Sequence, residues 1–382
     1  MGSKLVLLGG GHVHMYTMAQ VAELVGAGHE VLLIAPSPYH YYSGMAPGAL
    51  GGVYRPEDVR FDIRSIIEGG GGRFLQGRVA SIDGDARQVQ LESGERVGYD
   101  VLSCNLGSKV VTDRIDIRGG HWYPVKPVEK VIQAREKLVA VLAGGPATAA
   151  VVGGGPGSVE MAGNLWRIAR DEFGDPGRLR IKLFSSAPLL ERFPERMRIR
   201  ASKSLLRRGV EIHTGVRVSQ IEEGALTLDD GSTHEVDVTL LSTGIKPPTI
   251  FRDSGFPVAD DGGMLVNQHL QSIRDPEVFG GGDCIRYQPQ TLDRVGVYAV
   301  RQNRPLYRNL KAALDGEWDR LEEFDPGGGY LLALNMGDDT ALVKKYGIVF
   351  GGKLGFRLKD YLDRSFMKQF QVPERSEEPI ES

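Results

Sequence analysis

The feature that most constrains the fold is a short pattern that the chain contains twice. The apolar strand Lys4–Leu8 runs into the glycines Gly9 to Gly11, and the apolar segment Ala149–Val152 runs into Gly153 to Gly155, 144 residues later. A helical segment and a second apolar strand follow each cluster: a helix to about Val25 and the strand Val31–Ile34 in the first copy, and the helix Pro156–Arg170 and the strand Ile181–Phe184 in the second. This order predicts two βαβ units with parallel strands.

The similarity between the two copies extends beyond these units. Each copy continues with alternating residues and acidic-glycine turns, which indicate hairpins. Each then closes with an apolar strand that runs into a glycine turn, Tyr99–Leu102 before Gly107 and Val236–Leu241 before Gly244. The duplicated α/β plan predicts two nucleotide sites.

Glycine turns of this kind bind phosphate, because a pyrophosphate can approach the backbone and meet free N–H groups and the dipole of the following helix. Both copies lack the third glycine of the dinucleotide-binding fingerprint and carry His14 and Ser158 there. That glycine normally serves close packing of helix on strand, so its loss is tolerable. His12 or His14 either points at a cofactor or packs in the interior, and Pro156 suits a first helical turn.

The carboxylate that usually binds a ribose is also missing from both copies. The second strands end in Ile34-Ala35-Pro36 and Phe184-Ser185-Ser186. A carboxylate at this point selects the 2′-hydroxyl of NAD and repels the 2′-phosphate of NADP. Ser185, with Arg192 as a possible neighbour, therefore favours NADPH or use of both coenzymes.

Composition excludes several classes of function. The 382-residue chain has a net charge of −3 and no broad basic field of the kind that nucleic acid requires. Cys104 and Cys284 belong to no Cys/His cluster, so neither a disulfide framework nor a metal site is expected. No apolar run reaches the roughly 18 residues of a membrane span, and no signal-peptide pattern opens the chain. We expect a cytoplasmic protein that acts on small molecules.

Four motifs carry a resemblance to a known family: G-G-G-H-V-H at Gly9, Y-S-G-M-A-P-G at Tyr42, G-V-Y-A-V-R-Q at Gly296 and D-R-S-F-M at Asp363. Over nearly its whole length the chain resembles the two-dinucleotide-binding-domain flavoproteins of the pyridine nucleotide-disulfide oxidoreductase superfamily. Within that superfamily it looks like the type II NADH dehydrogenase-like branch, and most of all like the oxidoreductase domain fused ahead of selenophosphate synthase. No synthase portion follows here, so selenium metabolism is not implied.

The resemblance implies an α/β fold of two Rossmann-like domains, one for FAD and one for NAD(P), with the second inserted in the first. The implied boundaries are 1–112 and 241–315 for the FAD-binding domain, 113–240 for the NAD(P)H-binding domain, 316–372 for a C-terminal region and 373–382 for a flexible tail.

FAD as cofactor and NADH or NADPH as co-substrate follow from the same resemblance. It places the FAD diphosphate on Gly9 and Gly11, the ribityl hydroxyls at Gly282 and Asp283, and the pyrimidine end of the flavin near Val297 and Tyr298. The further FAD positions are His12, His14, Ala35, Pro47, Val79 and Gly107. The NAD(P)H positions are Gly153, Gly155, Pro156, Gly157, Ser158, Ser185 and Gly244. Glu160 corresponds to the family's glutamate near the nicotinamide, although a glutamate there is also favoured by the helix dipole alone.

The disulfide reductases of this superfamily carry a C-x-x-x-x-C helix after the first βαβ unit, whereas the corresponding segment here, Y-H-Y-Y-S-G-M-A-P-G, has no cysteine. Cys104 lies in an apolar strand and Cys284 in a turn, so both are expected to be structural. Electrons must then leave the flavin directly. We predict an FAD-dependent NAD(P)H dehydrogenase that reduces a quinone or a similar small acceptor, with orientation and electrostatics as the protein's main contribution.

Two other functions stay open from the sequence: a flavoenzyme that oxidises a sulfur or selenium species, and a flavin-based redox sensor or scaffold. The aromatic stretch Tyr39–Tyr42 and the segment near Tyr298 are candidates either for an acceptor pocket or for core packing.

The C-terminal segment 353–371 is basic and amphipathic. Its apolar residues recur at helical spacing, interleaved with basic ones: Leu354, Leu358, Tyr361, Leu362, Phe366 and Phe370, with Lys353, Arg357, Lys359, Arg364 and Lys368. Such a helix either contacts the cytoplasmic side of a membrane or packs on the protein's own core or on the second subunit of a homodimer. The thin stripe and the acids Asp360 and Asp363 favour packing.

Overall fold

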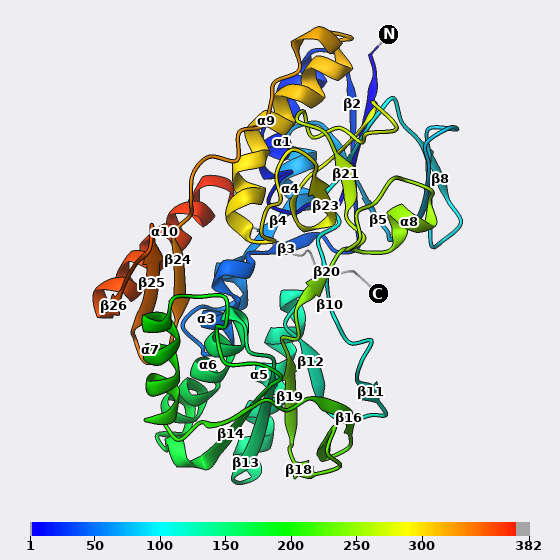
Figure 1. The fold of residues 1–382 in the computed structure, drawn as a ribbon. Coiled ribbons are helices and arrows are strands. Elements are labelled where there is room, and N and C mark those ends of the chain that lie inside the picture. Colours follow the sequence, from blue (N-terminus) through cyan, green and yellow to red (C-terminus); the bar gives the residue numbers. More distant parts are fainter. Residues whose placement is uncertain (1, 372–382) are drawn as a thin grey trace, which may run out of the picture.

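The computed structural model describes residues 2–371, so the expected tail at 373–382 lies outside the described part of the chain. The described residues form two α/β units, one above the other in Figure 1, and a smaller C-terminal unit that lies beside both.

The upper unit contains a five-stranded parallel sheet. Its strands, in order across the sheet, are β22 (Val278–Gly280), β9 (Val101–Cys104), β1 (Lys4–Leu8), β2 (Glu30–Ala35) and β5 (Arg73–Gln76). Strand β22 joins this sheet only after the lower unit has been completed. The second unit is therefore inserted in the first, as predicted.

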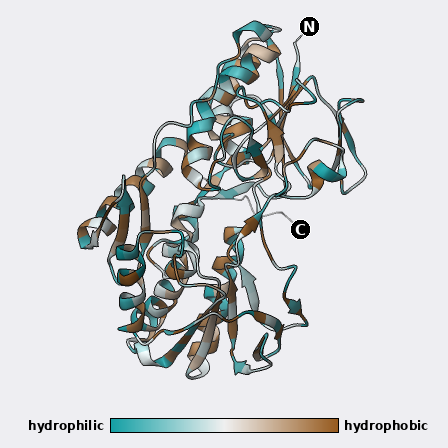
Figure 2. Cartoon of the chain, in the orientation of Figure 1, coloured by the Kyte–Doolittle hydropathy of each residue, from teal (hydrophilic) through white to brown (hydrophobic). Residues whose placement is uncertain are grey.

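The lower unit repeats this sheet strand for strand. Its order is β12 (Trp122–Pro124), β19 (Val238–Leu241), β13 (Ala147–Val152), β14 (Leu179–Ser185) and β15 (Glu211–Thr214), again all parallel. The strands of both sheets are mainly apolar (Figure 2), because helices or loops cover parallel sheets on both faces. The predicted duplication is confirmed.

The predicted hairpins form three antiparallel strands in each copy. The first consists of β6 (Val79–Asp83), β7 (Gln88–Leu91) and β8 (Arg96–Gly98), and the second contains β16 (Val218–Glu222), β17 (Ala225–Leu228) and β18 (Thr233–Glu235). In the second copy the short strand β11 (Asp116–Ile117) adds a fourth that is parallel to β16.

The helix after the first glycine turn differs from the prediction. Instead of one helix to Val25, the chain forms α1 (Met15–Ala19) and α2 (Val21–Gly26), separated at Gln20. The Gln20 amide donates to the carbonyls of both Tyr16 and Thr17, a shared bond that tightens the backbone locally. Neither proline nor glycine marks this break, so the sequence contains no signal for it.

The second glycine turn leads into an uninterrupted helix, α6 (Pro156–Phe173), close to the predicted range. The other long helices are α5 (Val128–Gly144), α7 (Glu195–Leu206) and α9 (Gly296–Leu314). The short helices α3 (Ala46–Leu50), α4 (Ile63–Gly69) and α8 (Ile250–Asp253) complete the two units, and α3 contacts α5 and α6 of the lower unit.

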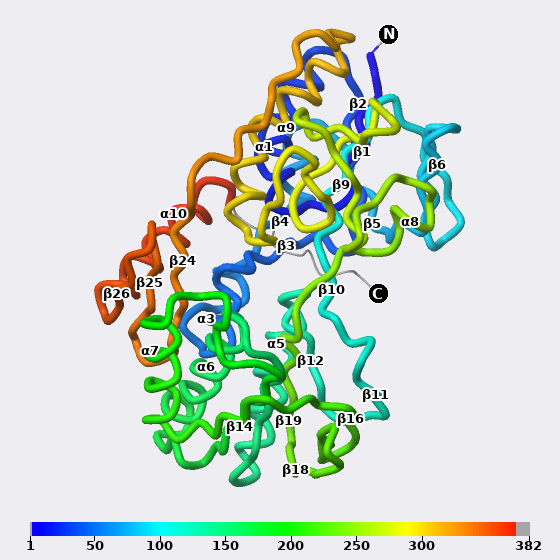
Figure 3. Tube along the Cα trace, in the orientation of Figure 1, coloured from blue at the N-terminus to red at the C-terminus, as the bar shows by residue number. Residues whose placement is uncertain are grey.

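The C-terminal unit is an antiparallel sheet of β24 (Leu332–Asn335), β25 (Ala341–Lys345) and β26 (Ile348–Gly352), followed by α10 (Lys353–Phe370). The orange and red tube in Figure 3 shows it running from α9 down the side of the lower unit. Helix α10 packs on the protein's own core, with Met367 and Phe370 buried there.

The face that α10 buries matches the predicted apolar stripe only toward the end of the helix, where Phe370 is buried and Phe366 packs against the core. The ion pair Lys359–Asp363 is buried, whereas Leu354, Tyr361 and Leu362 are exposed. Periodicity alone missed this, because Asp363 finds two partners inside the protein: Lys359 Nζ at 2.6 Å and the hydroxyl of Tyr42 at 3.2 Å.

Glycine allows the β24–β25 turn to lie directly on α6. A Cβ on Gly163 would overlap the carbonyl oxygen of Met336, and a Cβ on Gly337 would overlap that of Gly163. The backbones therefore meet with no side chain between them, which joins the C-terminal unit to the lower unit.

We predict that Gly163→Ala lowers the free energy of unfolding by about 1–3 kcal/mol, because the added methyl group overpacks this contact. Gly144→Ala is the matched control, since its Cβ would meet nothing within 4 Å, and we expect it to leave stability unchanged or raise it by up to about 1 kcal/mol. Urea unfolding of both variants measures this. Equal effects of the two substitutions on the free energy of unfolding would contradict the claim that this backbone contact excludes a side chain at Gly163.

Candidate functional site

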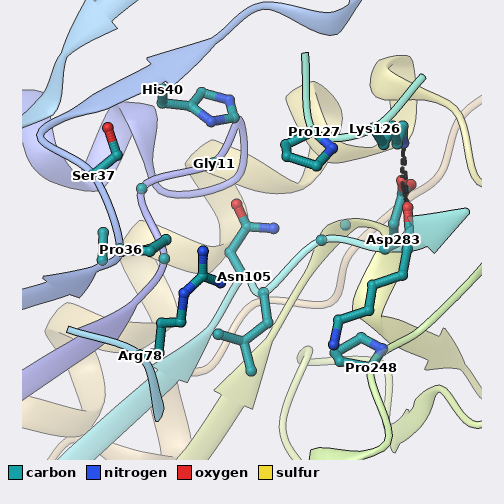
Figure 4. Close-up of a pocket in the computed structure, with 18 of the residues that line it drawn as sticks. Gly11, Pro36, Ser37, His40, Arg78, Asn105, Lys126, Pro127, Pro248 and Asp283 are labelled. Atoms are coloured by element: carbon teal, nitrogen blue, oxygen red, sulfur yellow. Dashed lines mark hydrogen bonds and ion pairs between the residues drawn. The ribbon is translucent and has the colours of Figure 1, made fainter. Parts of the chain in front are cut away.

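A cavity of about 700 Å³ lies beside the first glycine turn, at the carboxyl ends of the upper parallel strands. Its size falls in the range of small-molecule and cofactor sites. Eight of the predicted FAD positions line it: Gly9, Gly11, His12, Ala35, Val79, Gly107, Gly282 and Asp283. In Figure 4, Gly11, Pro36, Ser37 and His40 lie on one side of the cavity and Lys126 and Asp283 on the other, with Asn105 between them.

The first glycine turn is shaped by the neighbouring strand β9. The Gly9 amide donates to the carbonyl of Ile34 at 2.8 Å, and Gly9 has a φ of +83°. A Cβ on Gly9 would overlap the carbonyl oxygen of Asn105, and one on Gly11 would overlap its side-chain Oδ1. Only glycine fits at Gly9, where the obstacle is backbone and φ is positive, and it leaves the backbone open to the cavity.

Several polar groups at this turn are free to bind a ligand. Among residues 2–371, the amides of Gly11 and His12 find no acceptor, and the buried atoms Asn105 Oδ1 and His12 Nε2 have no hydrogen-bond partner. Buried polar atoms without partners are rare in folded proteins. The turn therefore fits a polar ligand such as a dinucleotide.

The second glycine turn repeats this construction. The Gly153 amide donates to the carbonyl of Phe184 at 2.8 Å, and a Cβ on Gly153 would overlap the carbonyl oxygen of Ser242. Gly155 precedes Pro156 at the start of α6, and a Cβ on Gly155 would meet no protein atom within 4 Å. An 18-residue helix thus begins at an open glycine turn, which is the arrangement that holds phosphate.

The remaining predicted positions of the second site surround this turn. Ser158 is buried at the start of α6 with its hydroxyl 3.5 Å from the Ser242 carbonyl, and Gly157 also faces Ser242. Ser185 ends β14, where its hydroxyl donates to the Ala187 carbonyl at 2.6 Å. Gly244 lies beyond the end of β19 with a φ of +97°.

His14 lies beneath the first turn and does not line the cavity. Its Nδ1 donates to the Gly9 carbonyl at 2.6 Å, and its Nε2 accepts from the Ser103 hydroxyl at 2.8 Å. Burial lowers the pKa of His14 to about 4, so the ring is neutral and both nitrogens are used. Of its two expected roles, His14 has the packing role in the structure.

His12, by contrast, lines the cavity and pairs with His40. Nδ1 of His12 and Nε2 of His40 are 3.2 Å apart, and Phe366 of α10 stacks on the His12 ring. Burial, and then the charge of Lys126, lowers the pKa of His12 to about 4. The cavity wall at this point is therefore uncharged.

Besides His14, three predicted FAD positions lie outside the cavity lining. Pro47 is buried in α3, Val297 lies in the first turn of α9, and the ring of Tyr298 contacts Tyr330. Their neighbours Gly296 and Ala299 line the cavity instead, so the start of α9 does approach it.

The structure adds a charged group that the sequence did not suggest. Lys126 Nζ lies 2.6 Å from Asp283 Oδ2, and the Ser108 hydroxyl donates to the same oxygen at 2.8 Å. All three residues line the cavity (Figure 4). Lys126 stands between β12 and α5, where no motif marks it. Asn105, which directly follows β9, could have been found as a polar residue at the carboxyl end of a parallel strand.

Glu160 lies in the second turn of α6 and contacts the C-terminal unit. Its Oε1 accepts from the backbone amide of Asn335 at 2.8 Å. Burial raises the pKa of Glu160 to about 7, against the opposing effects of Lys359 and the Asn335 amide. The carboxyl group therefore titrates near neutral pH.

Neither cysteine reaches the cavity. Cys104 and Cys284 are free, fully buried in the core of the upper unit and absent from the cavity lining. Burial raises the pKa of both thiols, that of Cys284 to about 12. They are inert packing residues rather than a redox pair.

Two open glycine turns of one construction, one of them on a large cavity, define a protein with two nucleotide sites. Residues 3–301 match the family model of the pyridine nucleotide-disulphide oxidoreductases, and the chain belongs to this family. It is an FAD-dependent NAD(P)H oxidoreductase.

Individual relatives agree with this assignment. The chain is 25% identical over 390 residues to the type II NADH:quinone oxidoreductase of Staphylococcus aureus (strain NCTC 8325 / PS 47), covering 94% of both chains. NDH2 from Plasmodium falciparum in complex with NADH shares the fold, with a TM-score of 0.82 at 14% identity over 98% of this chain and 99% of that one. So does the sulfide:quinone oxidoreductase of Aquifex aeolicus, with a TM-score of 0.77 at 17% identity over 97% and 91%.

We predict that iodoacetamide labels neither thiol of the folded protein at pH 8 and leaves NAD(P)H oxidation intact, because both thiols are buried and protonated. Mass spectrometry before and after unfolding counts the labelled cysteines. Rapid labelling of one cysteine in the folded protein, with loss of activity, would contradict this.

Proposed function

We propose that the chain oxidises NADH or NADPH and passes the electrons through FAD to a quinone or a similar small acceptor. The observation that carries this proposal is the sulfur-free lining of the cavity among the described residues. With no thiol at hand, electrons must pass directly from the flavin to the acceptor. The Staphylococcus aureus relative, an NADH:quinone oxidoreductase, supports a quinone as that acceptor.

We place FAD in the cavity of the upper unit. Its adenosine would lie at Ala35 and Val79, because a dinucleotide places its ribose at the end of the second strand. The free amides of Gly11 and His12 would bind the diphosphate. Oδ1 of Asp283, which accepts no hydrogen bond from residues 2–371, would accept from ribityl hydroxyls. When bound, the flavin supplies the ring that accepts a hydride and passes electrons on.

We place NAD(P)H on the second glycine turn, with its diphosphate at Gly155 and Gly157 and the start of α6. Glu160 would then lie toward the nicotinamide. A nicotinamide becomes cationic as it gives up its hydride, so an ionised Glu160 favours the transfer. The acceptor pocket at Tyr39–Tyr42, and the domain boundaries stated above, are part of the same proposal.

The end of β14 carries no group that rejects NADPH. Ser185 lies where a ribose-binding carboxylate would select NADH, and its hydroxyl donates a hydrogen bond to the Ala187 carbonyl. We therefore propose that the chain accepts both coenzymes.

We predict that anaerobic mixing with NADH or NADPH bleaches the flavin rapidly, and that a soluble quinone restores its colour. The rate of bleaching should rise with pH through about 7, because Glu160 ionises there. In Glu160→Gln this rise should vanish, leaving a rate near the low-pH limit of the wild type. Stopped-flow absorbance measures the bleaching, the reoxidation by quinone and the pH dependence of the rate.

Each other outcome contradicts part of the proposal. A flavin bleached only by sulfide-like donors would point to oxidation of a sulfur or selenium species. Turnover that stays slow with every acceptor, together with a redox-dependent change in assembly, would point to a sensor. An unchanged pH profile in Glu160→Gln would remove Glu160 from the nicotinamide site.

The C-terminal unit exposes several large apolar side chains. Leu354 and Tyr361, 77% and 69% exposed, lie one heptad apart on α10, and Tyr346 and Ile348 are exposed at the β25–β26 turn. Lys345, Lys353 and Arg357 beside them are also exposed. We propose that this surface contacts an anionic membrane peripherally, since apolar groups flanked by basic ones favour lipid headgroups. None of the described helices is long and apolar enough to cross a bilayer.

We predict that the wild type sediments with vesicles of anionic phospholipid and that Leu354→Glu/Tyr361→Glu reduces the bound fraction at least tenfold. Ile199→Glu/Leu206→Glu, which changes two exposed apolar residues of α7, is the control and should bind normally. If the wild type stays in the supernatant and instead dimerises through this surface, the membrane proposal is wrong.

A further inference from the structure

One side of the cavity in which we place FAD holds a tight group of polar side chains. Lys126 Nζ bonds to Asp283 Oδ2 at 2.6 Å and lies 3.2 Å from the Ser108 hydroxyl, which donates to the same oxygen. The side chains of Lys126 and Asp283 are only 27% and 15% exposed. Burial alone would raise the pKa of Asp283, but the charge of Lys126 and the two hydrogen bonds lower it below its ordinary value. The Asp283 carboxyl is therefore ionised.

The order of residues along the cavity places this pair near the flavin ring. Pro36, which follows β2, and Gly11 of the glycine turn lie on one side, and Lys126 with Asp283 lies on the other side (Figure 4). With adenosine at β2 and diphosphate at the turn, the rest of the cofactor extends toward the pair. This step depends on the FAD placement given under the proposed function.

The two carboxylate oxygens of Asp283 have different surroundings. Oδ2 accepts hydrogen bonds from Lys126 and Ser108, whereas Oδ1 accepts no hydrogen bond from any residue in the range 2–371. Oδ1 can therefore accept hydrogen bonds from ribityl hydroxyls. An ionised Asp283 that does so puts a negative charge in the cavity near the flavin ring. A hydride brings two electrons and one proton, so the ring gains one negative charge with each hydride that it accepts. An uncompensated Asp283 would oppose this gain.

We propose that Lys126 compensates the charge of Asp283 and thereby raises the reduction potential of the bound flavin. Lys126 is a positioning residue in this role, since it acts through Asp283 and through its charge. The lysine comes from the crossover between the two units, just before α5, and is held against the first unit by Asp283 and Ser108. The lower unit thus supplies the cation that makes the flavin of the upper unit a better acceptor for hydride.

A purely structural role is the alternative, because the same ion pair joins the two units. The two roles differ in what they change: a structural contact alters thermal stability and FAD retention, whereas charge compensation alters the potential. The test is a spectroscopic redox titration of the holoprotein against a dye of known potential, with a chemical reductant and with neither nicotinamide nor quinone present. Failure of electron transfer to a quinone therefore cannot be mistaken for failure of this inference.

We expect Lys126→Met to favour oxidised over reduced flavin at least tenfold at fixed potential, which for a two-electron couple is a midpoint about 30 mV lower. Lys126→Arg should restore the wild-type value, because it restores the charge. Asp283→Asn should shift the potential in the opposite direction. Lys130→Met, which removes an exposed lysine four residues further on, should leave the potential unchanged.

An unchanged potential in Lys126→Met, with or without a lower melting temperature, would overturn the inference. If Lys126→Met fails to retain FAD, the Asp283→Asn holoprotein decides, because a potential that is unchanged or lower in that variant overturns the inference as well. A wild-type chain that takes up no FAD would instead overturn the placement on which the inference depends.

Discussion

Both nucleotide sites depend on the same close approach between a glycine and the carbonyl oxygen of a neighbouring strand. Gly9 lies against the carbonyl of Asn105, and Gly153 lies against that of Ser242. No other residue fits, because a Cβ would occupy the space of the oxygen. This contact brings the turn in close over the strand ends and leaves its amides facing outward. Because the two parallel sheets have matching strand arrangements, the contact occurs in both units.

The two sites then differ in what surrounds the turn. The first turn leads into a short, interrupted helix and a large cavity whose charges gather at Lys126 and Asp283. The second leads into the 18-residue helix α6, on which the C-terminal unit packs, with the Asn335 amide bonded to Glu160. On the proposed placement, one construction provides a cavity for a resident cofactor and a helix terminus for a co-substrate. Neither site includes a thiol, which distinguishes this chain from the disulfide reductases of its family.

Much of this was predictable from the sequence, because glycine turns and apolar strands are local signals. The duplicated sheets and the burial of Cys104 and Cys284 follow from patterns within a few residues, whereas the insertion of the second unit was implied only by the family resemblance. Long-range contacts had no such signal. Lys126 meets Asp283 across 157 positions of sequence, and Glu160 meets Asn335 across 175. The inward face of α10 was predicted only in part for the same reason, since the partners of Asp363 include Tyr42, 321 positions away.

The measurement that tests this account most directly is the FAD content and NAD(P)H reducibility of the wild type and of Gly155→Val. The substitution adds its side chain where no protein atom lies within 4 Å of the new Cβ, so it probes the ligand rather than the fold. The account predicts one FAD per chain in both proteins, with reduction by NAD(P)H lost only in the variant. A colourless wild type that takes up no flavin, or a variant that loses FAD and keeps its reaction with NAD(P)H, would contradict it.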